Sequence, residues 1–288
     1  MRERDNFPVD GKKVDELVLK VLRLAKLENK TQMPDRYERL DLQEPDAKDS
    51  RAKEVKLLDK DGKELAALIV GKRKFTLGSK EGGTYIRVPG NAQTFLASGE
   101  LSPGEKARDW LVRDITDIKD KQIKSVTVTH PDGEKVIIGK DAPADASFKI
   151  MNLPKGMVPS SDFAADDFGR VLSVFLLDDA DKAGDVTLPP DQTIKAVFEG
   201  FDGFKVFVDY AEVNGQNWVT VKAEAPAAAA PKTDEKAAEP ATDWAKVVAE
   251  INTRAQGWVF QVPAYEVNAL KKKMAELARK PDADGAKS

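Results

Sequence analysis

Hydrophobic positions near the start of the chain repeat with a helical period. Apolar residues recur at spacings of three and four from Val14 to Leu22, which is typical of a helix with one face against a core. Asp10 stands where its side chain can accept a hydrogen bond from the first turn, and Asn29 stands at the expected end. The pattern predicts a core-facing helix over about residues 11–28.

Short alternating runs separated by turn residues follow this helix and indicate antiparallel hairpins. The turn at Asp59–Gly62 ends in a glycine, which readily takes the positive φ of a tight hairpin. The predicted pairs are Val55–Leu58 with Leu65–Val70, Thr84–Val88 with Gln93–Ala97, and Lys124–Thr129 with Lys135–Ile138. A helical turn is expected at about residues 114–121.

The second half of the chain repeats this order of elements. Helically spaced apolar residues predict a helix over residues 162–177, and three strands within 193–223 form a predicted meander. Residues 225–241 contain eight Ala and three Pro, a composition typical of a flexible tether. A helix from Thr242, a strand at 257–263 and a helix over about 264–279 then follow, and the strand is expected to complete the second sheet.

These elements predict an α+β fold of two duplicated modules, each a helix packed on antiparallel hairpins or a meander. The predicted organisation is a first module at 6–103, a connecting hairpin segment at 104–158, a second module at 159–224 plus 242–280, and the tether at 225–241.

Composition narrows the class of protein. The 288 residues include 46 Lys and Arg against 49 Asp and Glu, giving a net charge of −3, which does not favour nucleic-acid binding. The absence of cysteine excludes disulfides and thiolate metal sites. The longest apolar runs are far shorter than the roughly 18 residues of a membrane span.

The search for catalytic chemistry finds few candidates. His130 is the only histidine and lies in a predicted hairpin turn, where a role in the turn is favoured over catalysis. We therefore expect no enzyme activity, no metal site and no cofactor. A carboxylate-based hydrolase remains an alternative, and its candidate acids are Asp166, Asp167, Asp178 and Asp179.

Aromatic residues suggest a partner or ligand surface. Phe207 lies among charged residues on one face of its predicted strand, opposite the face that carries the core residues. Trp218 and Trp258 are the other candidate stacking platforms.

Several stretches resemble a bacterial domain-of-unknown-function family, number 4340 in its series. The similar stretches within residues 6–223 are Asn6–Asp10, Lys30–Pro45, Leu68–Lys72, Gly83–Arg87 and Asp109–Leu111. The resemblance implies an envelope protein encoded beside ABC-transporter and gliding-motility-type genes, with an N-terminal membrane anchor. On this resemblance, Met1–Asn6 is interpreted as the end of a strand. We therefore expect an upstream segment of about 20 apolar residues that spans the membrane and places the domain in the periplasm.

We therefore expect a non-enzymatic envelope accessory or interaction domain, with a transporter or another envelope protein as partner. A small-molecule or glycan binding module is the first alternative.

Overall fold

The computed structural model describes residues 1–75, 82–226 and 242–281. The chain divides into two compact units: a smaller unit, Pro8–Trp110, and a larger unit made of Met1–Phe7 with Leu111–Ser288. In chain order, the smaller unit is thus inserted between Phe7 and Leu111 of the larger one. Both units combine helices with antiparallel strands, so the predicted α+β class is confirmed.

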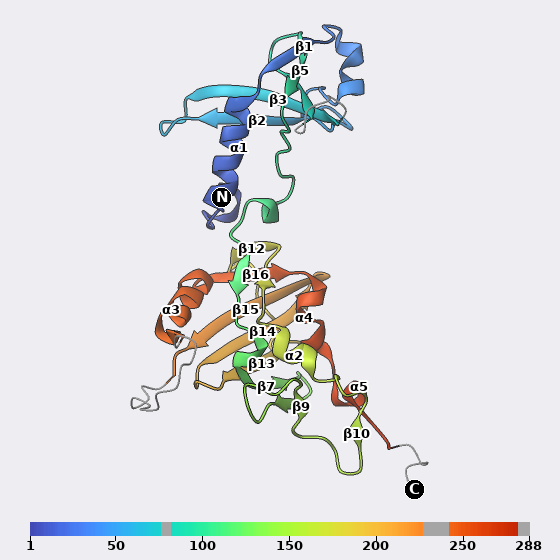
Figure 1. Ribbon diagram of the computed structural model, residues 1–288, viewed down its shortest axis with the longest axis vertical. Coiled ribbons are helices and arrows are strands. Elements are labelled where there is room, and N and C mark those ends of the chain that lie inside the picture. The colour runs from blue at the N-terminus through green and yellow to red at the C-terminus, as the bar shows by residue number, and fades with distance from the viewer. Residues whose placement is uncertain (76–81, 227–241, 282–288) are drawn as a thin grey trace. The chain divides into compact units, whose positions relative to one another are not determined.

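The smaller unit places one α-helix against a five-stranded antiparallel sheet in the order β1-β5-β4-β3-β2 (Figure 1). Asp10 caps the helix by accepting from the amide of Lys12 at 3.0 Å, as expected. Leu17 and Val21 pack against a buried cluster of Val55, Val70 and Leu101. The elements are α1 (Gly11–Arg23), β1 (Lys26–Asn29), β2 (Lys53–Leu58), β3 (Glu64–Lys74), β4 (Gly83–Arg87), β5 (Thr94–Ser98), and the 3-10 helices η2 (Pro34–Leu40) and η3 (Ala107–Asp109).

The larger unit is built on an eight-stranded antiparallel sheet in the order β12-β16-β15-β14-β13-β7-β8-β9. The strands are β7 (Ile123–Thr129), β8 (Lys135–Gly139), β9 (Lys149–Ile150), β12 (Asp179–Lys182), β13 (Ile194–Gly200), β14 (Lys205–Val213), β15 (Gln216–Glu224) and β16 (Trp258–Val262). Alternation along the strands gives the sheet one continuous buried face, because Val128, Ala196 and Val208 lie in register and are all buried.

Helices and two small strand pairs complete the larger unit. The helices are α2 (Asp166–Arg170), α3 (Trp244–Ala255), α4 (Ala264–Lys271), α5 (Met274–Leu277), η1 (Arg2–Arg4) and η4 (Asp120–Gln122). The small pairs join β6 (Asp114–Thr116) to β11 (Phe175–Leu176), and β10 (Val158–Pro159) to β17 (Ala278–Arg279). The ring of Trp244 on α3 stacks on Phe204 with a centroid distance of 3.6 Å.

The predicted hairpins, the meander and the strand after the tether are confirmed. In particular, β16 pairs with β15 through Trp218 and Gln261 and with β12 through Ala180 and Phe260. The segment after the tether therefore completes the larger sheet, as expected. Residues 227–241 of the predicted tether lie outside the described residues.

Three predicted helices are wrong in length. The first stops at Arg23, because the next residues form β1 and pair with β5. In the predicted helix at 162–177 only α2 is helical, and Phe175–Leu176 form β11. The carbonyl of Leu172 instead accepts from the amide of Ile118 and the hydroxyl of Thr116, both at 2.9 Å. The final helix breaks after Lys271 into α4 and α5.

The predicted helical turn at 114–121 is partly wrong, because Asp114–Thr116 forms β6 and only Asp120–Gln122 is helical. The first residues also differ from the expected strand end: they form η1, and Phe7 is 0% exposed. A bidentate pair between Arg4 and Asp179, at 2.5 and 2.6 Å, holds this segment in the larger unit.

The arrangement of strands also differs from the predicted organisation. The hairpin of β7 and β8, expected in a connecting segment at 104–158, belongs to the larger sheet because β7 pairs with β13. The internal duplication is not confirmed: the sheets have five and eight strands in different orders, and α2 has five residues where α1 has thirteen.

Candidate functional site

A polar cleft of about 340 Å³ lies between α2 and α4 in the larger unit. Figure 1 shows these two helices side by side, in agreement with their direct contacts. The lining residues are Asp167, Arg170 and Val171 from α2 and its end, and Tyr265, Glu266, Asn268, Ala269 and Lys272 from α4 and its end. The cleft therefore combines charged groups of both signs with one aromatic ring.

Glu266 is the most unusual group in this cleft. It lies half-buried in the first turn of α4, and the only hydrogen bond of its carboxylate within the described residues comes from the amide of Leu176 at 3.4 Å. Burial raises the pKa of Glu266 to about 7, against the opposing effects of the Leu176 amide and the charge of Arg113, while Asp178 raises it further. Glu266 can therefore gain or lose a proton near neutral pH.

The other charges of the cleft have partners. The ammonium of Lys272 lies 2.9 Å from the carboxylate of Asp167. Arg170 lies 3.9 Å from Asp166, one helical turn before it. Glu266 has no ion pair of this kind among the residues that the structure describes, so it is the acid of the cleft whose charge is least compensated.

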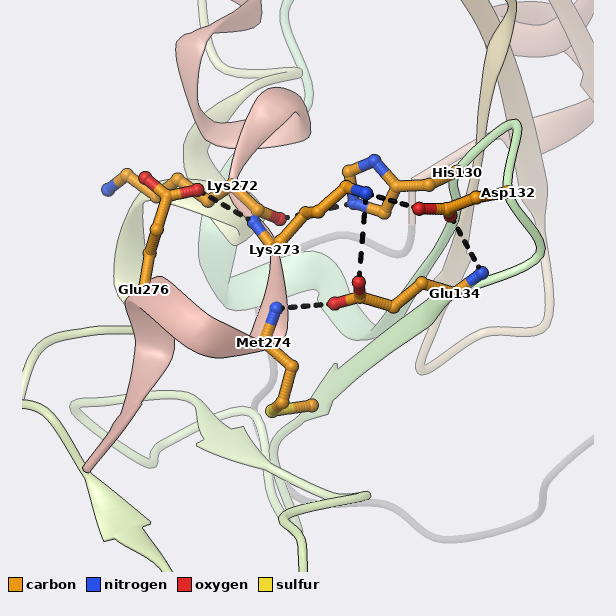
Figure 2. Close-up of polar contacts among 7 residues, drawn as sticks. All are labelled: His130, Asp132, Glu134, Lys272, Lys273, Met274 and Glu276. Carbon is orange, nitrogen blue, oxygen red and sulfur yellow. Dashed lines mark hydrogen bonds and ion pairs between the residues drawn. The ribbon is translucent and has the colours of Figure 1, made fainter. Parts of the chain in front are cut away.

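The chain beyond α4 is held by the turn that joins β7 to β8, as Figure 2 shows. Glu134 accepts from the amide of Met274 at 2.6 Å, and the ring of His130 lies 3.2 Å from the carbonyl of Lys272. Lys273 forms ion pairs with Asp132 and, at 3.9 Å, with Glu134. We call this group of contacts, made by His130, Asp132 and Glu134 with residues 272–274, the turn clamp.

The turn clamp explains both the break in the final helix and the position of the cleft. Lys272 has extended backbone at ψ 130°, so its carbonyl turns toward His130, and its side chain reaches Asp167 at the cleft. His130 is buried in this contact, and its placement in a hairpin turn agrees with the structural role favoured by the sequence. The clamp fixes the end of α4, and with it one wall of the cleft.

The three aromatic residues proposed from the sequence lie on the neighbouring strands β14, β15 and β16, in different surroundings. Phe207 is half-buried on β14, with the ammonium of Lys222 5.7 Å from its ring centre. Trp218 is only 5% exposed and belongs to the core. Trp258 is half-buried between Phe7 and the ammonium of Lys182, which lies 3.8 Å from its ring centre. None of the three lines the cleft between α2 and α4.

The four acids of the hydrolase alternative each have a partner of their own. Asp166 is buried and accepts from the amide of Phe148 at 2.8 Å, and Asp167 pairs with Lys272. Asp178 pairs with Arg113 at 3.1 Å, and Asp179 pairs with Arg4. These contacts favour structural roles for the four acids.

Sequence reasoning missed Glu266. An acid in the first turn of a helix is ordinarily explained by the helix dipole. The spacing of Glu266 in the sequence could have indicated its burial. Glu266 precedes Ala269 and Leu270 by three and four residues and therefore lies on the helix face that these two residues bury.

A separate apolar surface lies on the smaller unit. Leu19 and Leu22 on α1 and Leu27 on β1 are exposed, and Leu22 is 70% exposed. Since no residue of α1 is fully buried, the helix covers the sheet with only part of its apolar side. We call Leu19, Leu22 and Leu27 the α1 surface.

Comparison with known proteins places the chain in a family without giving an activity. Residues 1–159 match the family described as Domain of unknown function (DUF4340), a shorter span than the 6–223 over which the sequence showed a resemblance. The match contains the smaller unit and the β7–β8 turn, whereas the cleft residues 167–272 lie beyond it.

No curated protein and no solved structure matches the chain. No helix in the described ranges has the length and apolar character needed to cross a membrane. With more than half of its residues matched, the chain belongs to the DUF4340 family of domains of unknown function.

Proposed function

We propose that this protein is a non-catalytic binding domain whose ligand enters the cleft between α2 and α4. The observation that carries the proposal is Glu266: a half-buried carboxylate with one long hydrogen bond on the wall of a cavity. Clefts with a few convergent polar groups and a perturbed acid are the usual location of binding sites.

Binding is favoured over catalysis because of how the neighbouring charges are used. Carboxylate-based hydrolysis needs a second acid positioned to act with the first. Asp167, the other acid that lines the cleft, is paired with Lys272. This leaves Glu266 as a single recognition group.

A cleft-blocking variant tests this proposal. Asn268 is exposed and lines the cleft, so Asn268→Trp should fill it while leaving the core intact. We expect a library of small polar molecules to shift the amide NMR signals of residues 265–272 in the full chain and in Glu250→Trp, which changes an exposed position on α3 that does not line the cleft, but not in Asn268→Trp. Equal binding by the tryptophan variant, or no shift with any molecule, would contradict the proposal.

The α1 surface favours a second function, that of an accessory domain docking on a protein partner. Leu19 and Leu22 are exposed on one helix and Leu27 on the strand that follows it in the chain, and exposed apolar side chains of this kind favour an interaction surface. We propose that the partner is an envelope protein such as a transporter component, and that the domain lies on the periplasmic side of the membrane through an upstream anchor, the setting implied by the family resemblance.

Pull-down from bacterial membranes tests this second function. The full chain should retain an envelope or transporter component, and a Leu19→Ser, Leu22→Ser double variant should lose it. Retention of the same partner by the double variant would remove the α1 surface from the proposal.

A further inference from the structure

We propose that the cleft between α2 and α4 takes an organic cation, a guanidinium or primary ammonium group, with the carboxylate of Glu266 as its counter-ion. This inference rests on the proposed binding function and names the chemical class of the ligand. The same group could come from a free amine or from a basic side chain of a peptide, so the test below separates these two sources.

The first argument concerns what Glu266 lacks. A buried carboxylate is stable when it accepts several hydrogen bonds or pairs with a cation. Within the described ranges Glu266 accepts only from the amide of Leu176, at 3.4 Å, which is longer than a good hydrogen bond. A guanidinium or ammonium group placed in the cleft would donate the bonds that this carboxylate is missing.

The second argument concerns the positive groups of the cleft. Lys272 is neutralised by Asp167 at 2.9 Å, and Arg170 lies 3.9 Å from Asp166. An anionic ligand would have to compete with these carboxylates and would also face Glu266. The charges of the cleft therefore favour a cation over an anion.

The third argument concerns the rim. Tyr265 is 66% exposed and lines the cleft beside Glu266. The face of an aromatic ring attracts cations. Asn268, which also lines the cleft, supplies an amide oxygen that accepts a hydrogen bond.

Proton release should accompany binding. The charged groups that act on Glu266 are Arg113 and Asp178, and those that share the cleft are Asp167, Arg170 and Lys272. The carboxyl of Glu266 has a pKa of about 7 before a ligand binds. Near neutral pH, a fraction of the protein molecules must therefore release the proton of Glu266 before this group can pair with a cation. Affinity should therefore rise about tenfold in total between pH 6 and pH 8, because the ionised fraction of this carboxyl rises from about one tenth to about nine tenths over that range.

Titration of the full chain with simple probes tests the inference. The probes are n-butylguanidinium, n-butylammonium, the neutral n-butyramide, the anionic butyrate, and a blocked Ala-Arg-Ala peptide, each followed by the amide NMR signals of residues 265–272. We expect the cations to shift these signals and the neutral and anionic probes to leave them unchanged. Tighter binding of the peptide than of n-butylguanidinium would identify a protein side chain as the source, and the reverse would identify a free amine.

Two variants make the result specific. Glu266→Gln keeps the shape of the side chain and should weaken cation binding about 10- to 100-fold, the value of a charge-assisted hydrogen bond. Glu250→Gln removes an exposed acid of α3 and should have no effect. Unchanged cation binding by Glu266→Gln would overturn the inference.

The same titration separates the two levels of the proposal. Shifts of the cleft signals by butyrate or n-butyramide, without shifts by the cations, would overturn the ligand class and leave the binding function standing. No shift by any probe, together with none in the broader library described above, would overturn both.

Discussion

The ring of Phe7 meets that of Trp258 edge-on, with centroids 4.9 Å apart and an angle of 86° between the rings. These residues lie near opposite ends of the sequence, yet they share one core with Phe260, whose ring centre is 6.2 Å from that of Phe7. The first seven residues are thus an integral part of the larger unit.

Phe7→Ala should destabilise the larger unit. Removing a fully buried phenylalanine leaves a cavity and typically costs about 3 to 5 kcal/mol. Trp218, Trp244 and Trp258 all lie in the larger unit, so tryptophan fluorescence during denaturant unfolding measures the effect. Phe75→Ala is the matched control because Phe75 is 74% exposed. Equal midpoints for the two variants would refute a packing role for Phe7.

Glu266 should make stability depend on pH. Its pKa is raised from 4.5 to about 7 in the folded chain, so the folded state binds more protons than the unfolded state between these values. The free energy of unfolding that Glu266 contributes therefore falls as pH rises through this range. Thermal unfolding from pH 4.5 to pH 8 should show a shallower decline in Glu266→Gln than in the parent chain, while Glu250→Gln should follow the parent. Parallel curves for all three proteins would show that burial does not shift this acid.

The turn clamp should control the opening of the chain after α4. Glu134→Ala removes the acceptor of the Met274 amide and one partner of Lys273. We expect hydrogen exchange at Met274 to speed up at least about tenfold, as expected when a hydrogen bond to a charged group is lost. Glu212→Ala, which changes an exposed acid on β14, serves as the control. Unaltered protection at Met274 would mean that other contacts hold this segment.

A chain cut in the tether should remain associated. A protease site inserted after residue 230 separates residues 242–281 from the rest of the larger unit in sequence, while β16 still pairs on both sides and Trp244 still stacks on Phe204. Buried Val259 and Phe260 add hydrophobic stabilisation of about 1.5 to 3 kcal/mol each. Gel filtration after cleavage should give one peak that contains both fragments. Two separate peaks would show that the strand pairing is too weak to hold them.

Local patterns were sufficient to predict the hairpins and the start of the first helix. The cap of Asp10 on Lys12 and the positive φ of Gly62 depend on residues close in sequence, and both are present. The predicted helix at 162–177 is wrong because the carbonyl of Leu172 accepts hydrogen bonds from Thr116 and Ile118, more than fifty residues earlier in the sequence. No periodicity within the segment carries that information.

The candidate site was harder to predict for the same reason. Asp167 and Lys272 are paired at 2.9 Å across 105 positions of sequence, and the burial of Glu266 depends on the packing of its helix in the larger unit. The charge count could place these residues on a surface, but only the fold shows that Glu266 is the acid of the cleft with no ion pair among the described residues.

The insertion of the smaller unit between Phe7 and Leu111 has a consequence for synthesis on the ribosome. All strands of the five-stranded sheet have been made by residue 98, so that unit can fold while the rest of the chain is still being translated. Phe7 must wait until Trp258 and Phe260 emerge, and β15 also stays without its β16 neighbour until then. Late in translation, the nascent larger unit therefore exposes an unpaired strand edge at β15 and the ring of Phe7 without its packing partners. The chain most needs protection from aggregation during this interval.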